Sequence, residues 1–455
     1  MISALRRDWP FAARRVPFFY GWIIWLLSTL GMLASIPGQT IGIAVFTDAF
    51  IAALELERTP LATAYLLGTL ASATLLTRAG RWFDRYGARV TLLGASALLA
   101  VVLLTTAALP TLSDQLAAFA GVPLWVVSGP LIFLCYFGVR FSGQGVMVIA
   151  ATNLLLLWFE RRRGLVAGIR GVFVAFGFSL APWGLAMLMD RFGWQQALVV
   201  LAGVVGIGFL ALVAVFVRDR PELCGLSPDG LLRRTKAVRS AEPLSGSTTD
   251  ADGQTLSEAR RTRVFWAYSL GLASHALFGT AFTFHVVDIF AAAGRSREEA
   301  FAYFLPSAVL STLTNLGVGA LADRISLKPV LLAMLALFII GTIGLIRLDT
   351  AIGYGLLIVG YGVGSGLWNV NSSLAFVRHH GRTHLGEISG FNASITVIGS
   401  ALGPIAYSLA RDWTGSYTAA LTLGLAALVA LTLFSASFDH PQPAALRKTL
   451  DRNTA

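Results

Sequence analysis

The sequence has 455 residues, of which 56% are hydrophobic and only 13% are charged. Soluble globular proteins contain about 45–50% apolar and about 25% charged residues, so this composition excludes an ordinary soluble enzyme and, more firmly, a disordered chain. The net charge of +11 would suggest nucleic-acid binding in a soluble protein, but here the basic residues flank apolar segments. That arrangement is typical of membrane proteins, and we expect a lipid bilayer and no nucleic acid as partner.

Twelve apolar stretches approach or exceed the roughly 20 residues that a membrane-spanning helix needs. They lie near residues 18–47, 60–79, 89–109, 124–158, 164–189, 195–217, 264–292, 299–322, 328–347, 351–377, 385–410 and 417–438. The predicted fold is therefore all-α, with twelve transmembrane helices in two six-helix pseudo-repeats. The predicted domains are an N-terminal bundle (1–217), a cytoplasmic linker (218–263) and a C-terminal bundle with a short tail (264–455). The first stretch is too long for a signal peptide, and eleven more follow it.

Basic residues concentrate in the loops on one side of these spans and in the linker. The positive-inside rule then places these loops and both termini in the cytoplasm. We expect a multi-pass protein of a bacterial inner membrane that is monomeric and needs no cofactor or metal. The two cysteines, Cys135 and Cys224, provide neither a disulfide framework nor a metal-binding spacing.

Two elements of the first half recur in the second half. A shift of 222 residues superposes Gly164 on Gly386 and Asp190 on Asp412, together with further Gly, Leu and Pro positions between them. A shift of 239 residues superposes the Gly80–Arg85 segment on Gly319–Arg324. Any single glycine is explained by close helix packing, but a shared register of Gly, Pro and Asp is not. Parallel duplication of six spans is typical of transporters with a solute site between the halves.

The segment Gly80-Arg81-Trp82-Phe83-Asp84-Arg85-Tyr86-Gly87-Ala88-Arg89 resembles the G-x-x-x-D-R-x-G-x-R signature of the major facilitator superfamily. With twelve spans, a central linker and the second copy at Gly319–Arg324, the resemblance covers nearly the whole chain. Phe19–Trp22, Trp158–Leu165 and Asp190–Trp194 resemble the monocarboxylate and oxalate:formate antiporter branch. That branch often has an anion-binding Arg in span 8 and a Lys in span 1 or 11. These spans contain no internal Arg or Lys here, so its anion specificity does not transfer.

The resemblance implies a secondary active transporter, and not an enzyme, that moves a small solute by rocker-switch alternating access. The absence of a G-x-x-x-x-G-K-[ST] run argues against ATP as the energy source. A symporter or an antiporter that couples the solute to a proton or to a second solute fits this reading.

Asp84 is predicted at the cytoplasmic end of span 2, where a carboxylate accepts hydrogen bonds from the N-terminus of a neighbouring helix. Arg85 and Arg89 would pair with Glu160 and complete a cytoplasmic latch, and Asp323 and Arg324 would form a weaker second latch. The alternative is that the arginines only set the orientation in the membrane. The gating residues expected from the signature and its copy are Gly80, Asp84, Arg85, Gly87, Arg89, Glu160, Gly319, Asp323 and Arg324.

Charged and polar residues inside the spans are candidates for solute binding, because a charge at the bilayer centre costs about 2.5–3.5 kcal/mol and normally faces a cavity. Arg140 lies in mid-span with Gln144 four residues on, in a run that resembles an R-x-x-Q-G element of the superfamily with one extra residue. Arg170 aligns with Asn392 in the repeat. A structural hydrogen bond or ion pair for Arg140, and a position near the cytoplasm for Arg170, are the alternatives.

Polar residues also interrupt spans 1 and 10 and lie in span 7. The solute-site candidates there are Gln39, Trp368, Asn369 and Asn371, although each alone is better explained by a helix–helix hydrogen bond. In span 7, His285 and Asp288 are three residues apart and are predicted to pair, with His275 nearby, as a site for a coupled proton. Asp288 would instead be solvated if it lies at the outer rim.

Three functional hypotheses remain open at this stage. The first is transport of a small organic or inorganic anion, with Arg140 and Arg170 as its charge partners. The second is proton-driven efflux of a toxic or amphipathic compound, for which spans 7 and 10 supply Phe278, Phe282, Phe284 and Trp368. The third is a receptor or scaffold that uses the same fold and transports nothing.

Overall fold

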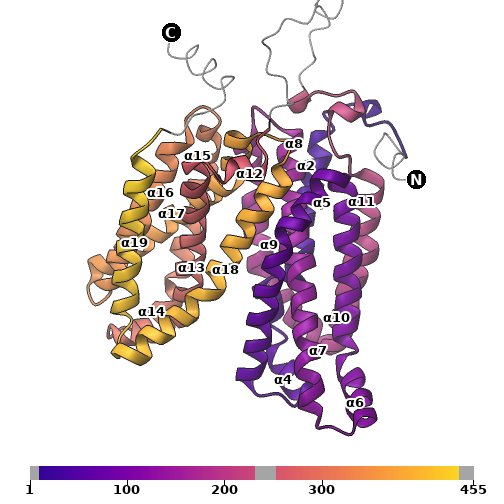
Figure 1. The fold of residues 1–455 in the computed structure, drawn as a ribbon, viewed down its shortest axis with the longest axis vertical. Helices are drawn as coiled ribbons and strands as arrows, with labels where there is room; N and C mark the ends of the chain where they lie inside the picture. The colour runs from indigo at the N-terminus through magenta and orange to yellow at the C-terminus, as the bar shows by residue number, and fades with distance from the viewer. Residues whose placement is uncertain (1–9, 231–252, 440–455) are drawn as a thin grey trace, which may run out of the picture. The chain divides into compact units, whose positions relative to one another are not determined.

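The computed structural model describes residues 10–230 and 253–439, and within these ranges the protein consists of helices with no strand (Figure 1). The prediction of an all-α membrane protein is confirmed. Residues 231–252 of the predicted linker and the basic residues of both termini, such as Arg6 and Arg447, lie outside the described residues. Eleven helices are long and apolar enough to cross a membrane.

Twelve predicted spans correspond to eleven helices in the described part of the chain because spans 2 and 3 share the label α5 (Arg58–Ala107), which consists of two helices joined at Gly87. Within α5, Gly87 has φ 86° and ψ 170°, so its backbone is not helical and the element is divided there. Only glycine adopts such a positive φ without strain. The second glycine of the signature segment therefore makes the turn between two spans.

The chain divides into two compact units, each of which combines distant parts of the sequence. Unit 1 contains the described residues of 1–161, 173–252 and 383–394, and unit 2 contains those of 162–172, 253–382 and 395–455. The helices α9 (Arg163–Phe192) and α18 (Leu385–Thr414) each contribute to both units. The domain boundaries predicted from the sequence (1–217, 218–263 and 264–455) therefore differ from the boundaries of the two units. The main reason is that the first turns of α9 belong to unit 2 and the rest to unit 1, while the first turns of α18 belong to unit 1 and the rest to unit 2.

Unit 1 is built around α5 and the elements that pack along it. Its further elements are α2 (Gly21–Ala34), η2 (Ile36–Gly38), α3 (Thr40–Ala44), α4 (Thr47–Leu54), α6 (Leu109–Ala120), α7 (Leu124–Val139), η3 (Arg140–Met147), α8 (Val148–Trp158), α10 (Trp194–Gly203), η4 (Val204–Phe209) and α11 (Leu210–Phe216). The helix α6 lies in the connection between spans 3 and 4.

Unit 2 is a bundle of long apolar helices that run beside one another (Figure 1). Its elements are α12 (Leu256–Ala259), α13 (Arg263–Ala292), α14 (Arg297–Ala302), α15 (Phe304–Ala322), α16 (Leu327–Ile346), α17 (Ala351–His380) and α19 (Thr418–Ala436). Glycines at the α16–α17 contact allow close approach, since a Cβ on Gly360 would lie 2.4 Å from the Gly341 nitrogen. Small residues are the usual means of packing membrane helices.

Span 1 is broken at the residues where the sequence predicted an interruption. The helix α2 ends at Ala34, a single 3-10 turn covers Ile36–Gly38, and Gln39 is extended with φ −86° and ψ 155°. Pro37 lacks an N–H group and cannot continue the α-helical hydrogen bonds. Span 4 is also irregular, because residues Arg140–Met147 form a π-helix. A π-helical turn accommodates an extra residue, which accounts for the added residue in the Arg140–Gly145 run.

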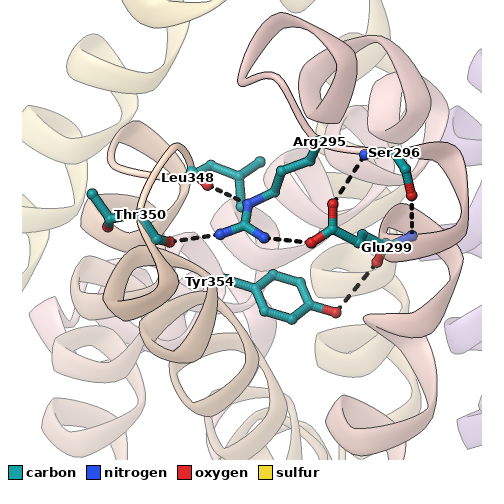
Figure 2. A network of polar contacts seen from close by, with 6 residues as sticks. All are labelled: Arg295, Ser296, Glu299, Leu348, Thr350 and Tyr354. Carbon is teal, nitrogen blue, oxygen red and sulfur yellow. Dashed lines mark hydrogen bonds and ion pairs between the residues drawn. The ribbon is translucent and has the colours of Figure 1, made fainter.

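A network of polar contacts ties the α13–α14 loop to the α16–α17 loop in unit 2 (Figure 2). Arg295 donates from Nε to the Leu348 carbonyl (2.5 Å), from Nη2 to the Thr350 carbonyl (2.8 Å) and from Nη1 to Glu299 Oε1 (2.6 Å). The ring of Tyr354 lies 4.9 Å from the Arg295 guanidinium carbon. One guanidinium group thus satisfies two loop carbonyls and a carboxylate.

The same glutamate closes the first turn of α14. Ser296 Oγ accepts from the Glu299 amide and Glu299 Oε2 accepts from the Ser296 amide, which is a capping box. The Tyr354 hydroxyl donates to the Glu299 carbonyl over 3.3 Å. One connected set of hydrogen bonds therefore holds the α13–α14 loop, α14, the α16–α17 loop and the start of α17 together.

We expect Arg295→Ala to destabilise the protein by about 2–3 kcal/mol, because three hydrogen bonds of a charged group are lost. The measurement is the midpoint of thermal unfolding in detergent, monitored for Arg295→Ala and for Arg297→Ala. Arg297 is exposed and makes only a ring contact with Phe301, so it is the matched control. Equal midpoints for the two variants would contradict a stabilising role for the network.

Candidate functional site

The carboxylate of Asp84 binds the N-terminus of α18 within unit 1. Its Oδ1 accepts from the Gly386 amide and its Oδ2 from the Glu387 amide, each over 2.8 Å. The first N–H groups of a helix have no intrahelical partner, and the helix dipole favours a negative charge at this end. Both oxygens of Asp84 are therefore used in a charge-assisted contact.

Unit 2 contains a second contact of the same kind. Asp323 follows α15, and its two oxygens accept from the Gly164 amide (2.7 Å) and the Leu165 amide (3.1 Å). These amides belong to the first turn of α9, which begins at Arg163. Asp323 is thus bound to a helix N-terminus as Asp84 is.

A pair of glycines brings the backbones together beside each carboxylate. A Cβ on Gly80 would lie 1.9 Å from the Gly386 carbonyl oxygen, and a Cβ on Gly164 would lie 2.0 Å from the Gly319 carbonyl oxygen. Real Cβ atoms do not approach a carbonyl so closely, so only glycine fits without movement of the helices. The carboxylate contacts depend on this approach, because the side chain of aspartate is short.

The two contacts are related by the sequence repeat. The 239-residue shift carries Gly80 and Asp84 to Gly319 and Asp323, while the 222-residue shift relates Gly164 to Gly386. Residues that recur together in the sequence thus meet in pairs in the structure. This pairing accounts for the shared register of Gly and Asp that close packing alone did not explain.

The arginines of the signature segment have partners other than those expected. The Glu160 side chain forms no ion pair in the described parts of the chain, and its amide instead donates to Asp229 Oδ2 over 3.0 Å. Arg89 is 1% exposed and donates from its amide to Asp219 Oδ1 over 2.8 Å, so its neighbour comes from the end of span 6. Arg85 is exposed and lies 5.3 Å from the Tyr86 ring. The expected Arg85/Arg89–Glu160 cluster is not formed because Asp219 and Asp229 occupy this region.

The second carboxylate also has an unexpected basic partner. Arg378, at the end of α17, lies 3.3 Å from Asp323 Oδ1, and both side chains are largely buried. Arg324 is exposed. In unit 1 the corresponding extra contact is weaker, because Arg81 and Glu387 are 3.4 Å apart with the arginine 58% exposed.

Arg140 lies at the break in span 1. Its Nη1 donates to the Gly38 carbonyl (3.3 Å) and to Thr40 Oγ1 (3.2 Å), and its guanidinium carbon lies 5.3 Å from the Tyr65 ring. The Tyr65 hydroxyl is 2.8 Å from Thr40 Oγ1. Arg140 is 3% exposed and its Nε has no hydrogen-bond partner. Tyr65 was not expected from the sequence, because nothing local relates it to a residue 75 positions away.

The other solute-site candidates in spans 1, 4, 5 and 11 are more dispersed. Gln144 is half-buried in the π-helix and Gln39 donates to Ser35 Oγ over 3.0 Å, so neither side chain bonds to Arg140. Arg170 is 6% exposed in unit 2, whereas Asn392 is half-buried in unit 1. An apolar pocket in unit 1 is lined by residues that include Pro37 and Val139, but Arg140 is not among them.

His275 of span 7 and Trp368 of span 10 belong to an aromatic cluster in unit 2. The imidazole of His275 is stacked on Phe338 at 4.7 Å and lies 5.2 Å from Trp368. The Trp368 indole N–H donates to the Leu272 carbonyl. Asn371 is fully buried and donates to the Leu367 carbonyl of its own helix (3.0 Å), so it faces the bundle interior, while Asn369 is half-buried.

His285 does not pair with Asp288. It is 8% exposed, with Nε2 3.1 Å from the Pro404 carbonyl oxygen and 3.3 Å from Ser408 Oγ, and with Nδ1 3.4 Å from the Tyr417 hydroxyl. Asp288 is exposed. The expected pairing on one helix face fails because the imidazole turns towards α18 and the start of α19.

Comparison with known proteins agrees with this geometry. Residues 54–404 match the family model described as Major Facilitator Superfamily. Three similar solved structures are the E. coli fucose:proton symporter FucP (TM-score 0.59, 16% identity, 92% of this chain and 98% of that chain), the proton:xylose symporter XylE (0.65, 14%, 93% and 96%) and a bacterial homologue of the iron transporter ferroportin (0.67, 16%, 91% and 98%). At these identities the likeness shows the fold alone. No curated protein matches the sequence.

We expect Gly80→Ala to weaken the Asp84 contact, because the added methyl group must push α18 away from α5. The matched control is Gly94→Ala in the part of α5 after Gly87, where a Cβ meets nothing within 4 Å. The measurement is the thermal midpoint of each purified variant, with a loss of about 1–3 kcal/mol expected for overpacking at Gly80 and none at Gly94. If both variants behave alike, the glycine contact is not required.

Proposed function

Because the chain belongs to the major facilitator superfamily, we propose that it is a secondary active transporter that moves a small anionic solute by rocker-switch alternating access. Its location in this proposal is the inner membrane of a bacterium, with both termini in the cytoplasm and a monomer as the working form. The branch of the superfamily nearest to this function is that of the monocarboxylate and oxalate:formate antiporters.

The observation that carries the proposal is the pair of aspartate contacts with helix N-termini. Asp84 binds the start of α18 in unit 1, and α18 continues into unit 2, while Asp323 binds the start of α9, which continues into unit 1. In this proposal each contact fixes the first turns of a helix that passes from one unit into the other, and loss of the contact frees that helix to change its course. Each contact consists of two charge-assisted hydrogen bonds, which is strong enough to favour one state and weak enough to break in every cycle.

The anionic character of the solute is inferred from Arg140. Its guanidinium group is buried, and no carboxylate within the described residues forms an ion pair with it. A charge in this position is costly unless it is compensated. Among residues 10–230 and 253–439, its partners are a carbonyl, a hydroxyl and the Tyr65 ring, so a carboxylate or another oxyanion would complete the site.

Coupling to a proton is inferred from His285. An imidazole can both accept and donate a proton, and this one is held by contacts from α18 and from the start of α19. The second candidate function, proton-driven efflux of an amphipathic compound, is favoured by the His275–Phe338–Trp368 cluster, whose rings offer an aromatic surface in unit 2.

The third hypothesis is a receptor that transports nothing. It predicts that loss of the Asp84 contact leaves the biological output unchanged.

The anion proposal predicts that small carboxylates or oxyanions, and not amphipathic drugs, raise the thermal midpoint of the purified protein, because a ligand stabilises the state it binds. The best of them should also support counterflow in proteoliposomes. Arg140→Gln should lower its affinity by about 10- to 100-fold, since a charged hydrogen bond contributes about 1.5–3 kcal/mol. Glutamine is chosen because its amide can still donate to the Gly38 carbonyl.

Arg191→Gln is the matched control, because Arg191 is an exposed arginine at the end of α9. Stabilisation by drugs alone would favour efflux. Unchanged affinity in Arg140→Gln would overturn the anion proposal and leave Arg140 as a cap for the broken helix.

The alternating-access proposal predicts that Asp84→Asn exposes residues at the start of α18, because asparagine has one accepting oxygen and its NH2 group would face a helix N–H group where Asp84 presents a second oxygen. Ser394 is a sensitive position, since it is 8% exposed and donates to the Ala73 carbonyl. In a Ser394→Cys variant without Cys135 and Cys224, Asp84→Asn should accelerate maleimide labelling by about tenfold or more. Asp114→Asn, at an exposed position of α6, should not. An unchanged labelling rate would argue against a gate at Asp84.

A further inference from the structure

The imidazole of His285 is buried near the α18–α19 loop of unit 2. Tyr407 stacks parallel to it at 6.3 Å, and Tyr417 lies at 5.4 Å on a tilted plane. A nearby hydrogen bond between Thr280 and Ser400 also joins α13 to α18. The two ring nitrogens therefore have fixed neighbours rather than free solvent.

These neighbours determine the position of the proton on neutral His285. A backbone carbonyl accepts hydrogen bonds and cannot donate, so the Nε2 atom facing the Pro404 carbonyl oxygen must hold the proton. Nδ1 then has a free lone pair directed at the Tyr417 hydroxyl, which donates to it. Nδ1 is therefore the atom of His285 that gains a proton when an imidazolium forms, and it faces the Tyr417 hydroxyl.

Tyr417 in turn faces charged groups at the surface. It is 7% exposed, whereas Asp288 and Asp412 are exposed, and the Arg411 guanidinium carbon lies 5.5 Å from its ring. Burial raises the pKa of the Tyr417 phenol, and the negative charges of Asp288 and Asp412 act in the same direction while Arg411 opposes them. The phenol therefore keeps its proton at neutral pH and remains a donor.

We propose that Tyr417 is the relay that passes protons from the exposed carboxylates Asp288 and Asp412 to Nδ1 of His285. The inference rests on the proposed proton coupling. A proton from a protonated carboxyl group or from water binds Tyr417 Oη, while the phenolic proton of Tyr417 moves to Nδ1. One O–H bond is broken at the source, one N–H bond is formed at His285 and the phenol is restored, so that one proton is transferred and no phenolate accumulates.

The groups that face this path from each packed element can all be named. They are Asp288 on α13, then Tyr407, Ser408, Arg411 and Asp412 on α18, and Tyr417 before α19. Among them, Tyr407 provides a matched comparison, because its ring also stacks on His285 but its buried hydroxyl has no hydrogen-bond partner. Removal of either hydroxyl leaves a phenyl ring of the same shape.

The test compares Tyr417→Phe and Tyr407→Phe in the full chain reconstituted in proteoliposomes without added solute. The probe is water itself, and the readout is the rate of proton exchange at the His285 imidazole, followed by NMR of isotope-labelled histidine. The protein has six histidines, and the His285 signal is the one that His285→Gln removes. We expect Tyr417→Phe to slow the exchange by about 100-fold, the lower end of the effect of a positioned proton donor, and Tyr407→Phe to leave it unchanged.

Unchanged exchange in Tyr417→Phe, or equal slowing in both variants, would overturn the relay. If the Tyr417 hydroxyl has only a structural role, Tyr417→Phe will lower the thermal midpoint without slowing the exchange. This outcome also counts against the relay. The exchange rate does not depend on transport. The relay can therefore fail while proton coupling at His285 stands, and coupling fails separately if His285→Gln retains proton-dependent transport of the solute identified by counterflow.

Discussion

The structure depends most on a short carboxylate that reaches the N-terminus of another helix across a pair of glycines. At Asp84 and Asp323 the carboxylate replaces the partners that the first helical amides lack. The glycines are as necessary as the acid, because any side chain at Gly80 or Gly164 would separate the backbones. Charge and steric fit thus act together, and neither alone would hold the first turn of α18 or of α9 in place.

Irregular helices supply the other special positions in unit 1. The break after Pro37 frees the Gly38 carbonyl, and the π-helix of span 4 packs against that break so closely that a Cβ on Gly38 would lie 2.7 Å from the Gly143 Cα. A carbonyl freed within a membrane protein must find a donor. Arg140 donates to it from Nη1, and the Nε atom of the same guanidinium group has no hydrogen-bond partner.

The two groups on which the solute and proton parts of the proposal rest lie in different units. Unit 1 contains a buried guanidinium beside a hydroxyl and a phenol, which is suited to an oxyanion. Unit 2 contains an imidazole whose two nitrogens face a carbonyl and a phenol, which is suited to a proton.

The sequence alone determined the all-α membrane class, the duplication, the break in span 1 and the presence of a carboxylate where a helix begins. The membrane class follows from hydropathy, and the break follows from Pro and Gly, all of which act locally. The duplication becomes visible when the two halves of the sequence are compared at a fixed shift. Only the tertiary structure decided that Arg89 meets Asp219 rather than Glu160 and that His285 turns away from Asp288. Successive residues of a helix point about 100° apart, so partners depend on helix rotation and packing that no local pattern specifies.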